Sequence, residues 1–299
     1  NRVFIHDILR GQMGFKGYIN SDTGIVHNMK WGVEMLDEPE RIGFAVNNAG
    51  VDVISGLFDN EFGRQAYDRA TNGYYDTHTL PEGFTPEMVT LNDEALDRAV
   101  ERILRINYKY LENAKPETPW DKEADHLLSA EIAEECMVLL KNNGVLPLDK
   151  ADDIAFIGEF AAKPRFQGGG SSHIHCFKTT SALEAAEGLK VTYARGYSVK
   201  DDAATPEMIA EAVEAARKAK TAVIFAGLPD SYESEGYDRA HMGMPPCQNA
   251  LIEAVAAANP NTVVVLHNGS PVEMPWVDKV AAVVEAYLGG QAVGGATKL

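Results

Sequence analysis

Short apolar runs and longer amphipathic stretches alternate through the first part of the chain, residues 1–112. This pattern predicts a strand over residues 18–20, a helix over about 29–47 and a second strand over 51–56. A polar and aromatic stretch follows from about 57 to 91, and loops of that length are usually functional. Strand–helix units are therefore expected in this part of the chain.

The next helix is predicted from both its first turn and its periodicity. Asn92 is suited to the N-cap, and Asp93 and Glu94 favour the first turn that follows it. One face should pack against the rest of the protein, because apolar residues follow at helical spacing: Leu96, Ala99, Val100, Ile103, Leu104 and Leu111.

The remainder of the chain has a different organisation. Residues 113–125 contain prolines and charges and are expected to be a linker, followed by a helix over about 127–141. Strands are then predicted at 153–158, 190–195, 221–226, 262–267 and 281–287, with helices near 180–187, 205–219 and 247–258. Several strands are apolar on both faces, which is typical of a parallel sheet covered by helices on both sides. Residues 126–299 are therefore expected to form an α/β domain with a mostly parallel sheet.

Composition narrows the possible partners. The 299 residues are 45% hydrophobic and 24% charged, which is typical of a globular protein with one large or two ordinary domains. A net charge of −17 repels phosphate backbones, so no nucleic-acid partner is expected. No apolar run is long enough to span a bilayer, and no membrane partner is expected. Cys136, Cys176 and Cys247 show no metal or disulfide spacing, and Cys136 is expected to be a small core residue.

Asp22 directly follows the strand predicted at residues 18–20. Functional groups of parallel α/β folds gather at the C-terminal ends of strands. An ionised carboxylate at such a place can attack an anomeric carbon or stabilise its positive charge. The alternative, which position alone favours, is an aspartate that caps the following turn.

Glu235 lies in a polar stretch after the strand predicted at 221–226. A carboxylic acid with a raised pKa can protonate a leaving oxygen. The alternative is a solvated acidic loop, because four acidic residues crowd together there: Asp230, Glu233, Glu235 and Asp238.

Residues 168–172 form a glycine–serine run (GGGSS) whose backbone amides can approach a ligand closely. The run lacks the spacing of nucleotide-binding loops. His173 and His175 follow without nearby cysteines, which is weak support for a metal site. Aromatic side chains, Trp31 among them, can stack on sugar rings, although most aromatics are simply packed. No cofactor or metal is expected.

Several motifs, taken in order, resemble those of glycoside hydrolase family 3. Residues 14–24 (GFKGYINSDTG) are similar to the family's nucleophile signature, and residues 235–239 (EGYDR) are similar to its acid/base loop. Further similarities lie at 45–56, 99–105, 133–148, 168–172, 287–291 and 294–296. The resemblance covers nearly the whole chain.

The resemblance implies a retaining β-glycosidase, most often a β-glucosidase or β-xylosidase, with a β-linked oligosaccharide or glycoside as substrate. It implies that Asp22 is the nucleophile and Glu235 the general acid/base. Glu233 is the fallback for the acid, because two acids two residues apart in an extended loop could trade places. Ser171 and Ser172 are candidate substrate-binding residues.

The resemblance also implies a fold. Residues 1–112 would be the C-terminal part of a (β/α)8-type barrel, and residues 126–299 an α/β sandwich domain. The chain departs from the family pattern at Thr23, where many members carry Trp after the nucleophile, so stacking would fall to Trp31, a further candidate substrate-binding residue.

Only the last two or so of about eight barrel units are visible, so an interior or truncated piece is expected. Residues 1–112 would then need a complementary barrel fragment or self-association. A non-catalytic carbohydrate-binding or interaction fragment is the alternative function.

Overall fold

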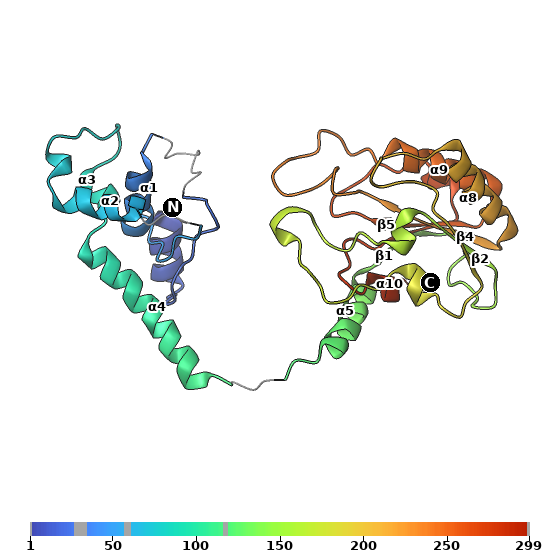
Figure 1. The fold of residues 1–299 in the computed structure, drawn as a ribbon, viewed down its shortest axis with the longest axis horizontal. Helices are drawn as coiled ribbons and strands as arrows, with labels where there is room; N and C mark the ends of the chain where they lie inside the picture. The colour runs from blue at the N-terminus through green and yellow to red at the C-terminus, as the bar shows by residue number, and fades with distance from the viewer. Residues whose placement is uncertain (1, 27–34, 57–60, 116–118, 298–299) are drawn as a thin grey trace. The chain divides into compact units, whose positions relative to one another are not determined.

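A computed structural model of the chain describes residues 2–26, 35–56, 61–115 and 119–297. The chain divides into two compact units, Asn1–Thr118 and Pro119–Leu299, each of which is described by itself (Figure 1). None of the helices in these ranges combines the length and the apolar character that crossing a membrane would require.

The first unit is mainly helical. Its elements are the π-helix η1 (Val3–Gln12), α1 (Glu38–Asn47), α2 (Glu61–Thr71), the 3₁₀-helix η2 (Tyr74–Asp76), α3 (Pro86–Val89) and α4 (Asp93–Asn113). α1 begins at a capping box, in which Asp37 and Glu40 each accept the backbone N–H of the other. The stretch expected as a loop at 57–91 instead contains three helices within its described part, residues 61–91, because Ala66 of α2 and Val89 of α3 are buried in small cores beside α1.

The two strands expected at 18–20 and 51–56 are much shorter than predicted. Asn20 and Val53 form a single parallel bridge, and the N–H of Ser21 donates to the carbonyl of Val53 at 2.9 Å. Parallel strands are normally stabilised by neighbouring strands and by covering helices. The described residues give each segment one neighbour, so the pairing forms without regular strands.

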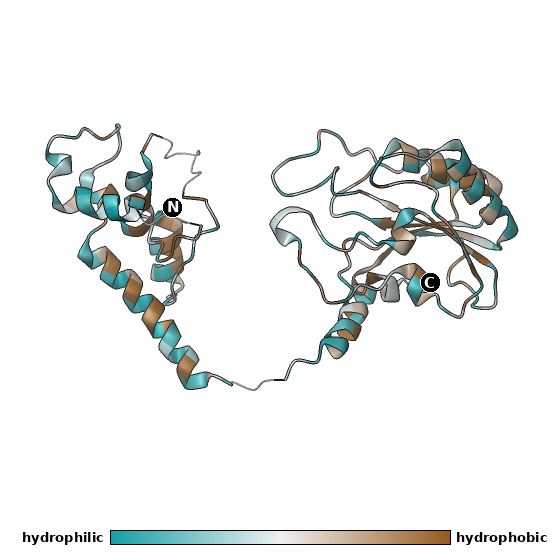
Figure 2. Cartoon of the chain, viewed as in Figure 1, coloured by the Kyte–Doolittle hydropathy of each residue, from teal (hydrophilic) through white to brown (hydrophobic). Residues whose placement is uncertain are grey.

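The helix expected after Asn92 forms as α4. The side chain of Asn92 accepts the N–H of Ala95 at 2.9 Å, as its predicted capping role requires. Within α4 only Ala95 and Ala99 are buried. Its apolar face is otherwise largely uncovered in the described structure, because Val100, Leu104 and Leu111 are exposed. Figure 2 shows hydrophobic bands along this helix.

A six-stranded sheet forms the centre of the second unit, as far as its residues are described, in the order β1-β6-β5-β4-β2-β3. The strands are β1 (Val138–Asn142), β2 (Ile154–Ile157), β3 (Val191–Ala194), β4 (Thr221–Gly227), β5 (Thr262–His267) and β6 (Ala282–Glu285). All neighbouring pairs are parallel except β1 with β6. The prediction of a mostly parallel sheet is confirmed.

Helices and short turns connect the strands. They are α5 (Lys122–Cys136), α6 (Glu159–Ala162), η3 (Gly170–Ser172), α7 (Ala182–Ala185), α8 (Pro206–Lys218), α9 (Pro246–Ala258), η4 (Val277–Lys279) and α10 (Val293–Ala296). α8 and α9 pack side by side against the sheet, whereas α10 packs against α5 and α7; Figure 1 shows the two groups above and below the sheet.

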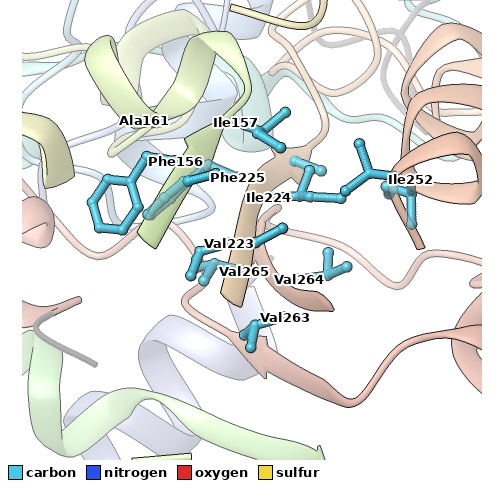
Figure 3. Packing of buried hydrophobic residues seen from close by; sticks show 14 of the residues in the cluster. Phe156, Ile157, Ala161, Val223, Ile224, Phe225, Ile252, Val263, Val264 and Val265 are labelled. Atoms are coloured by element: carbon cyan, nitrogen blue, oxygen red, sulfur yellow. The ribbon is translucent and has the colours of Figure 1, made fainter. Parts of the chain in front are cut away.

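The core of the second unit lies on the central strands. Every residue of β2, β4, β5 and β6 is buried, as the apolar composition of these segments predicts for strands covered on both faces. Figure 3 shows how the side chains of β2, β4 and β5 pack with Ile252 of α9.

Three predictions for the start of this unit differ from the structure. The helix expected at 127–141 ends at Cys136, and residues 138–142 form the edge strand β1. Pairing with β6 satisfies the backbone of this segment, and that tertiary pairing overrides the local helical pattern. Cys136, expected in the core, is exposed. α5 begins at Lys122, inside the expected linker, because Asp121 caps it.

The strand order positions the loops that matter for function. β2 is followed in the chain by β3 on one side, whereas β4 is followed by β5 and β6 on the other. In open α/β sheets this reversal leaves a crevice at the carboxyl ends of the two adjacent strands. The glycine–serine loop (residues 168–172) follows β2, and the segment carrying Glu235 follows β4.

Candidate active site

Asp22 lies two residues beyond the parallel bridge of the first unit. Its side chain is exposed, and Oδ1 accepts the N–H of Thr23 at 2.7 Å. The turn is tied to the neighbouring segment, because the N–H of Ser55 donates to Ser21 Oγ at 2.9 Å. Asp22 therefore makes the turn-capping contact that its position favours, while its carboxylate remains open to solvent.

A second aspartate, which the sequence analysis did not single out, holds this region together. Asp52 has a side chain that is only 1% exposed and forms ion pairs with Arg10 of η1 at 2.7 Å and Arg102 of α4 at 2.6 Å. It also accepts the N–H of Ile19 at 2.8 Å. The sequence did contain a signal for this role, because Asp52 is a charged residue inside the apolar run at 51–56. A carboxylate buried in such a run is normally paired with a cation. Asp52 thus anchors the segment that ends at Asp22.

Glu235 belongs to residues 228–239, called here the β4 loop. Its carboxylate accepts the backbone N–H of Ser171 at 2.6 Å and also the hydroxyl of Ser171. These hydrogen bonds, that of the hydroxyl first, hold the pKa of Glu235 below its ordinary value. The sequence analysis required a raised pKa for an acid, so the second unit by itself holds Glu235 in the opposite, ionised state.

The glycines of the glycine–serine loop make this contact possible. A Cβ on Gly169 would lie 2.6 Å from Ser234 Oγ, and a Cβ on Gly170 would lie 2.4 Å from the Cβ of Glu235. Gly170 also has a φ of +77°, which disfavours residues with a side chain. Ser172, the other candidate serine, donates to the carbonyl of Gly169 at 3.0 Å and so braces the turn.

Glu233, the fallback acid, is occupied by other contacts. Its Oε1 receives Arg165 Nη1 at 3.0 Å and the N–H of Gly269 at 2.6 Å, and its Oε2 receives the hydroxyl of Ser270. Its side chain is 14% exposed. A carboxylate with both oxygens engaged is a poor candidate for proton transfer to a ligand, so the geometry favours Glu235 over Glu233.

The strand-end loops enclose a surface cavity of about 520 Å³. This volume lies in the range of small-molecule sites. Among the residues that line it are Glu235, Ser172, Tyr237, Asp238 and Arg239. The crevice expected from the strand order therefore contains the candidate acid.

The remaining candidates contribute less. Trp31 lies outside the described residues. The rings of His173 and His175 have their centroids 6.0 Å apart. Within the described ranges, no three or more His, Cys, Asp or Glu side chains are grouped so as to hold a metal ion.

Comparison with known proteins identifies the family to which the chain is similar. Residues 137–298 match the model of the glycosyl hydrolase family 3 C-terminal domain. Over 99% of its length the chain is 41% identical to thermostable beta-glucosidase B of Acetivibrio thermocellus, and it covers 36% of that protein. It is 30% identical over 99% of its length to a beta-xylosidase of Formosa agariphila, of which it covers 42%.

A solved structure gives the same result. The GH3 beta-glucosidase of Bifidobacterium adolescentis matches 99% of the chain with a TM-score of 0.79 and 33% identity, and the chain covers 40% of that structure. The family match covers more than half of the chain, which therefore belongs to glycosyl hydrolase family 3. It spans well under half the length of the relatives described here.

Proposed function

We propose that this chain carries both catalytic carboxylates of a retaining β-glycosidase, with Asp22 as the nucleophile and Glu235 as the general acid/base. The observation that carries the proposal is the position of Glu235, which borders the cavity at the reversal of strand order. Membership of the family and the activities named for its relatives support it, and β-glucosides are the first substrate to test.

The chemistry would take two steps. Asp22 attacks the anomeric carbon and forms an ester bond to the sugar, while the bond to the leaving oxygen breaks and that oxygen takes the proton of Glu235. Glu235, now a carboxylate, removes a proton from water, whose oxygen attacks the anomeric carbon and releases Asp22. In a working site the two carboxyl groups would lie about 5–5.5 Å apart.

The lowered pKa of Glu235 fits this scheme if the working site changes its surroundings. Departure of the Ser171 hydroxyl from Glu235 would remove the largest cause of the lowering. A second carboxylate nearby, such as Asp22, would favour the protonated form of Glu235 by charge repulsion. In this scheme the hydrogen bonds from Ser171 hold Glu235 while no substrate is bound. Ser171 and Ser172 then serve mainly to hold the glycine–serine loop in place.

The first unit would be the end of a (β/α)8-type barrel, with the second unit as the sandwich domain that follows it. The parallel pairing of Asn20 with Val53 supports this, because neighbouring barrel strands are parallel. The exposed apolar face of α4 supports it too, since such a face is normally buried against further structure. A complementary barrel fragment or a second copy would supply that structure.

The activity is tested on the protein expressed from its complete reading frame, with 4-nitrophenyl β-glucoside. Asp22→Asn should lower kcat/KM by about 10³-fold or more. Glu235→Gln should lower kcat/KM for phenyl β-glucoside, whose leaving group needs a proton, by about 10²–10⁴-fold, the usual contribution of general acid catalysis. Asp97→Asn on α4 and Glu187→Gln, both at exposed carboxylates, are the matched controls. An unimpaired Asp22→Asn variant would exclude Asp22 as nucleophile and favour a non-catalytic role.

The need for further barrel structure has its own test. Hydrogen exchange of the 299-residue chain, shown by sedimentation to be monomeric, should reveal weak protection at residues 18–22 and 51–56. Each of these segments has one pairing partner among the described residues. Strong protection of both segments in that monomer would rule out the requirement.

A further inference from the structure

Arg165 makes several polar contacts with the described loops of the second unit. It lies between α6 and the glycine–serine loop, and its side chain is 5% exposed. Its Nη1 donates to the carbonyl of Leu228, and its Nε lies 3.0 Å from a carboxylate oxygen of Asp230. The guanidinium also reaches Glu233 twice, at Oε1 (3.0 Å) and at the backbone carbonyl (3.1 Å). One buried cation thus contacts three residues of the β4 loop.

Glu233 extends this contact to a third loop. While one of its oxygens receives Arg165, the same carboxylate accepts the N–H of Gly269 at 2.6 Å and the hydroxyl of Ser270. Gly269 and Ser270 follow β5. The Arg165–Glu233 pair therefore joins the loops that follow three neighbouring parallel strands, β2, β4 and β5.

Each residue of the Arg165–Glu233 pair lies close in sequence to one residue of the Ser171–Glu235 contact. Glu235 is two residues after Glu233, and Ser171, which holds the carboxylate of Glu235, is six residues after Arg165. Between the two glutamates, Ser234 pairs with Tyr237 in a single antiparallel bridge that closes the turn. Fixing Glu233 to Arg165 thus fixes the point from which the chain reaches Glu235.

We propose that Arg165 is a positioning residue for Glu235: through its hydrogen bonds to the β4 loop and to Glu233, it holds that loop in the place from which Glu235 reaches a leaving oxygen. The proposal rests on the proposed function, because it assigns Arg165 a role in the acid step. Arg165 lines the same cavity as Glu235, and the role proposed for it is to hold the loop that carries Glu235.

The chemistry of the contact explains why arginine stands here. The guanidinium is a planar fork whose N–H groups point in several fixed directions, so it can donate to two carbonyls and one carboxylate while it forms an ion pair with a second carboxylate. A lysine ammonium keeps the charge but lacks the fork. Without any cation, Glu233 would remain as a mostly buried carboxylate with only the N–H of Gly269 and the Ser270 hydroxyl as partners, and the loop would shift to hydrate it.

The decisive experiment compares two substrates that differ in their need for an acid. Phenyl β-glucoside has a poor leaving group that requires protonation, whereas 2,4-dinitrophenyl β-glucoside has a good one that does not. kcat/KM reports the first step for both, measured on the protein expressed from its complete reading frame. For Arg165→Met, we expect about a 10²-fold loss with the phenyl substrate, because a displacement near 1 Å costs that much, and little loss with the dinitrophenyl substrate.

Three variants complete the comparison. Arg165→Lys should fall between Arg165→Met and the unmodified protein, because charge without the fork restores only part of the contact. Lys279→Met, which removes an exposed ion pair with Glu253, should leave both substrates unaffected. Equal losses of Arg165→Met on both substrates, or no loss on either, would overturn the positioning role. If Glu235→Gln shows no such substrate dependence, the proposed function fails, whatever Arg165 does.

A second measurement keeps the proposal testable should Arg165→Met be inactive through misfolding. Hydrogen exchange of the Arg165→Lys chain should be faster than that of the unmodified chain at residues 228–235, 168–172 and 268–271. Exchange within β4 and β5 should be unchanged, because the core of the sheet does not depend on the contact. Unchanged exchange in all three loops would refute the anchoring that the proposal requires.

Discussion

Replacing Gly170 by alanine tests how closely the glycine–serine loop and the β4 loop must approach each other. The new Cβ would lie 2.4 Å from the Cβ of Glu235 and 2.6 Å from its Oε2. Ordinary contact begins near 3.4 Å, so the backbone that carries Glu235 must retreat by about 1 Å. A displacement of about 1 Å in a catalytic group costs about 10² in rate. Gly170→Ala should therefore lower kcat/KM for an aryl β-glucoside by about 10²-fold.

Two other glycines separate displacement of the acid from backbone strain. Gly170 has a φ of +77°, and forcing alanine into this region costs about 1–2 kcal/mol. Gly188 has a similar φ of +87° but no atom within 4 Å of the position of a Cβ. Gly188→Ala should therefore lose comparable stability without losing activity. Gly169→Ala, at an ordinary φ of −80°, meets mainly the movable Ser234 Oγ and should have an intermediate effect.

The assay combines kcat/KM of the protein from its complete reading frame with urea unfolding of the same variants. The expected pattern is that Gly170→Ala is destabilised at least as much as Gly188→Ala, and that only Gly170→Ala of these two shows a large loss of activity. A folded Gly170→Ala protein with unchanged kcat/KM would refute the reasoning. So would an equal activity loss in Gly188→Ala, because strain and not displacement would then be the cause.

Ser171→Ala should raise the pKa of Glu235, since the lost hydroxyl is the main cause of its lowering; carbon-13 NMR titration of the carboxyl group checks this, and an unchanged pKa would contradict it. Acidification should destabilise the second unit, because burial lowers the pKa of His267 to about 4 whereas the unfolded chain takes up the proton near 6.5. The free energy of unfolding therefore decreases by about 3 kcal/mol as the pH falls from 6.5 to 4. Urea unfolding at pH 7 and pH 4.5 should show a smaller decrease for His267→Gln than for the unmodified protein. Asp52→Asn should destabilise the first unit by about 3 kcal/mol by leaving Arg10 and Arg102 without their carboxylate. Hydrogen exchange of that unit measures this, with Asp97→Asn as the control, and equal exchange in both variants would count against the ion-pair network.

The fold of the second unit was largely predictable from the sequence. Five strands were predicted to within about two residues. Four of them are buried on both faces, and such a strand leaves an unbroken apolar run such as residues 262–267. β1 was not predictable in the same way. Its residues continue the helical pattern of α5, and only their pairing with β6, far along the chain, makes them a strand.

The first unit shows the converse. The pattern at 18–20 and 51–56 predicts strands, and the two segments do pair, yet through one bridge. The apolar spacing of α4 predicts a packed helix, and the helix forms at its predicted cap. Its face stays exposed, because local periodicity specifies which side is apolar but cannot supply the surface that covers it.

By itself the sequence determined the α/β character of the second unit, the order of its central strands and the family, because these depend on local periodicity and on short motifs. It also drew attention to Asp22 and Glu235. Only the tertiary structure decided that Glu235 is held ionised by Ser171 and that Glu233 is bound to Arg165, 68 residues away. Proton affinity and ion pairing depend on distances of a few ångströms between loops, and those distances are set when the sheet brings the ends of β2, β4 and β5 together.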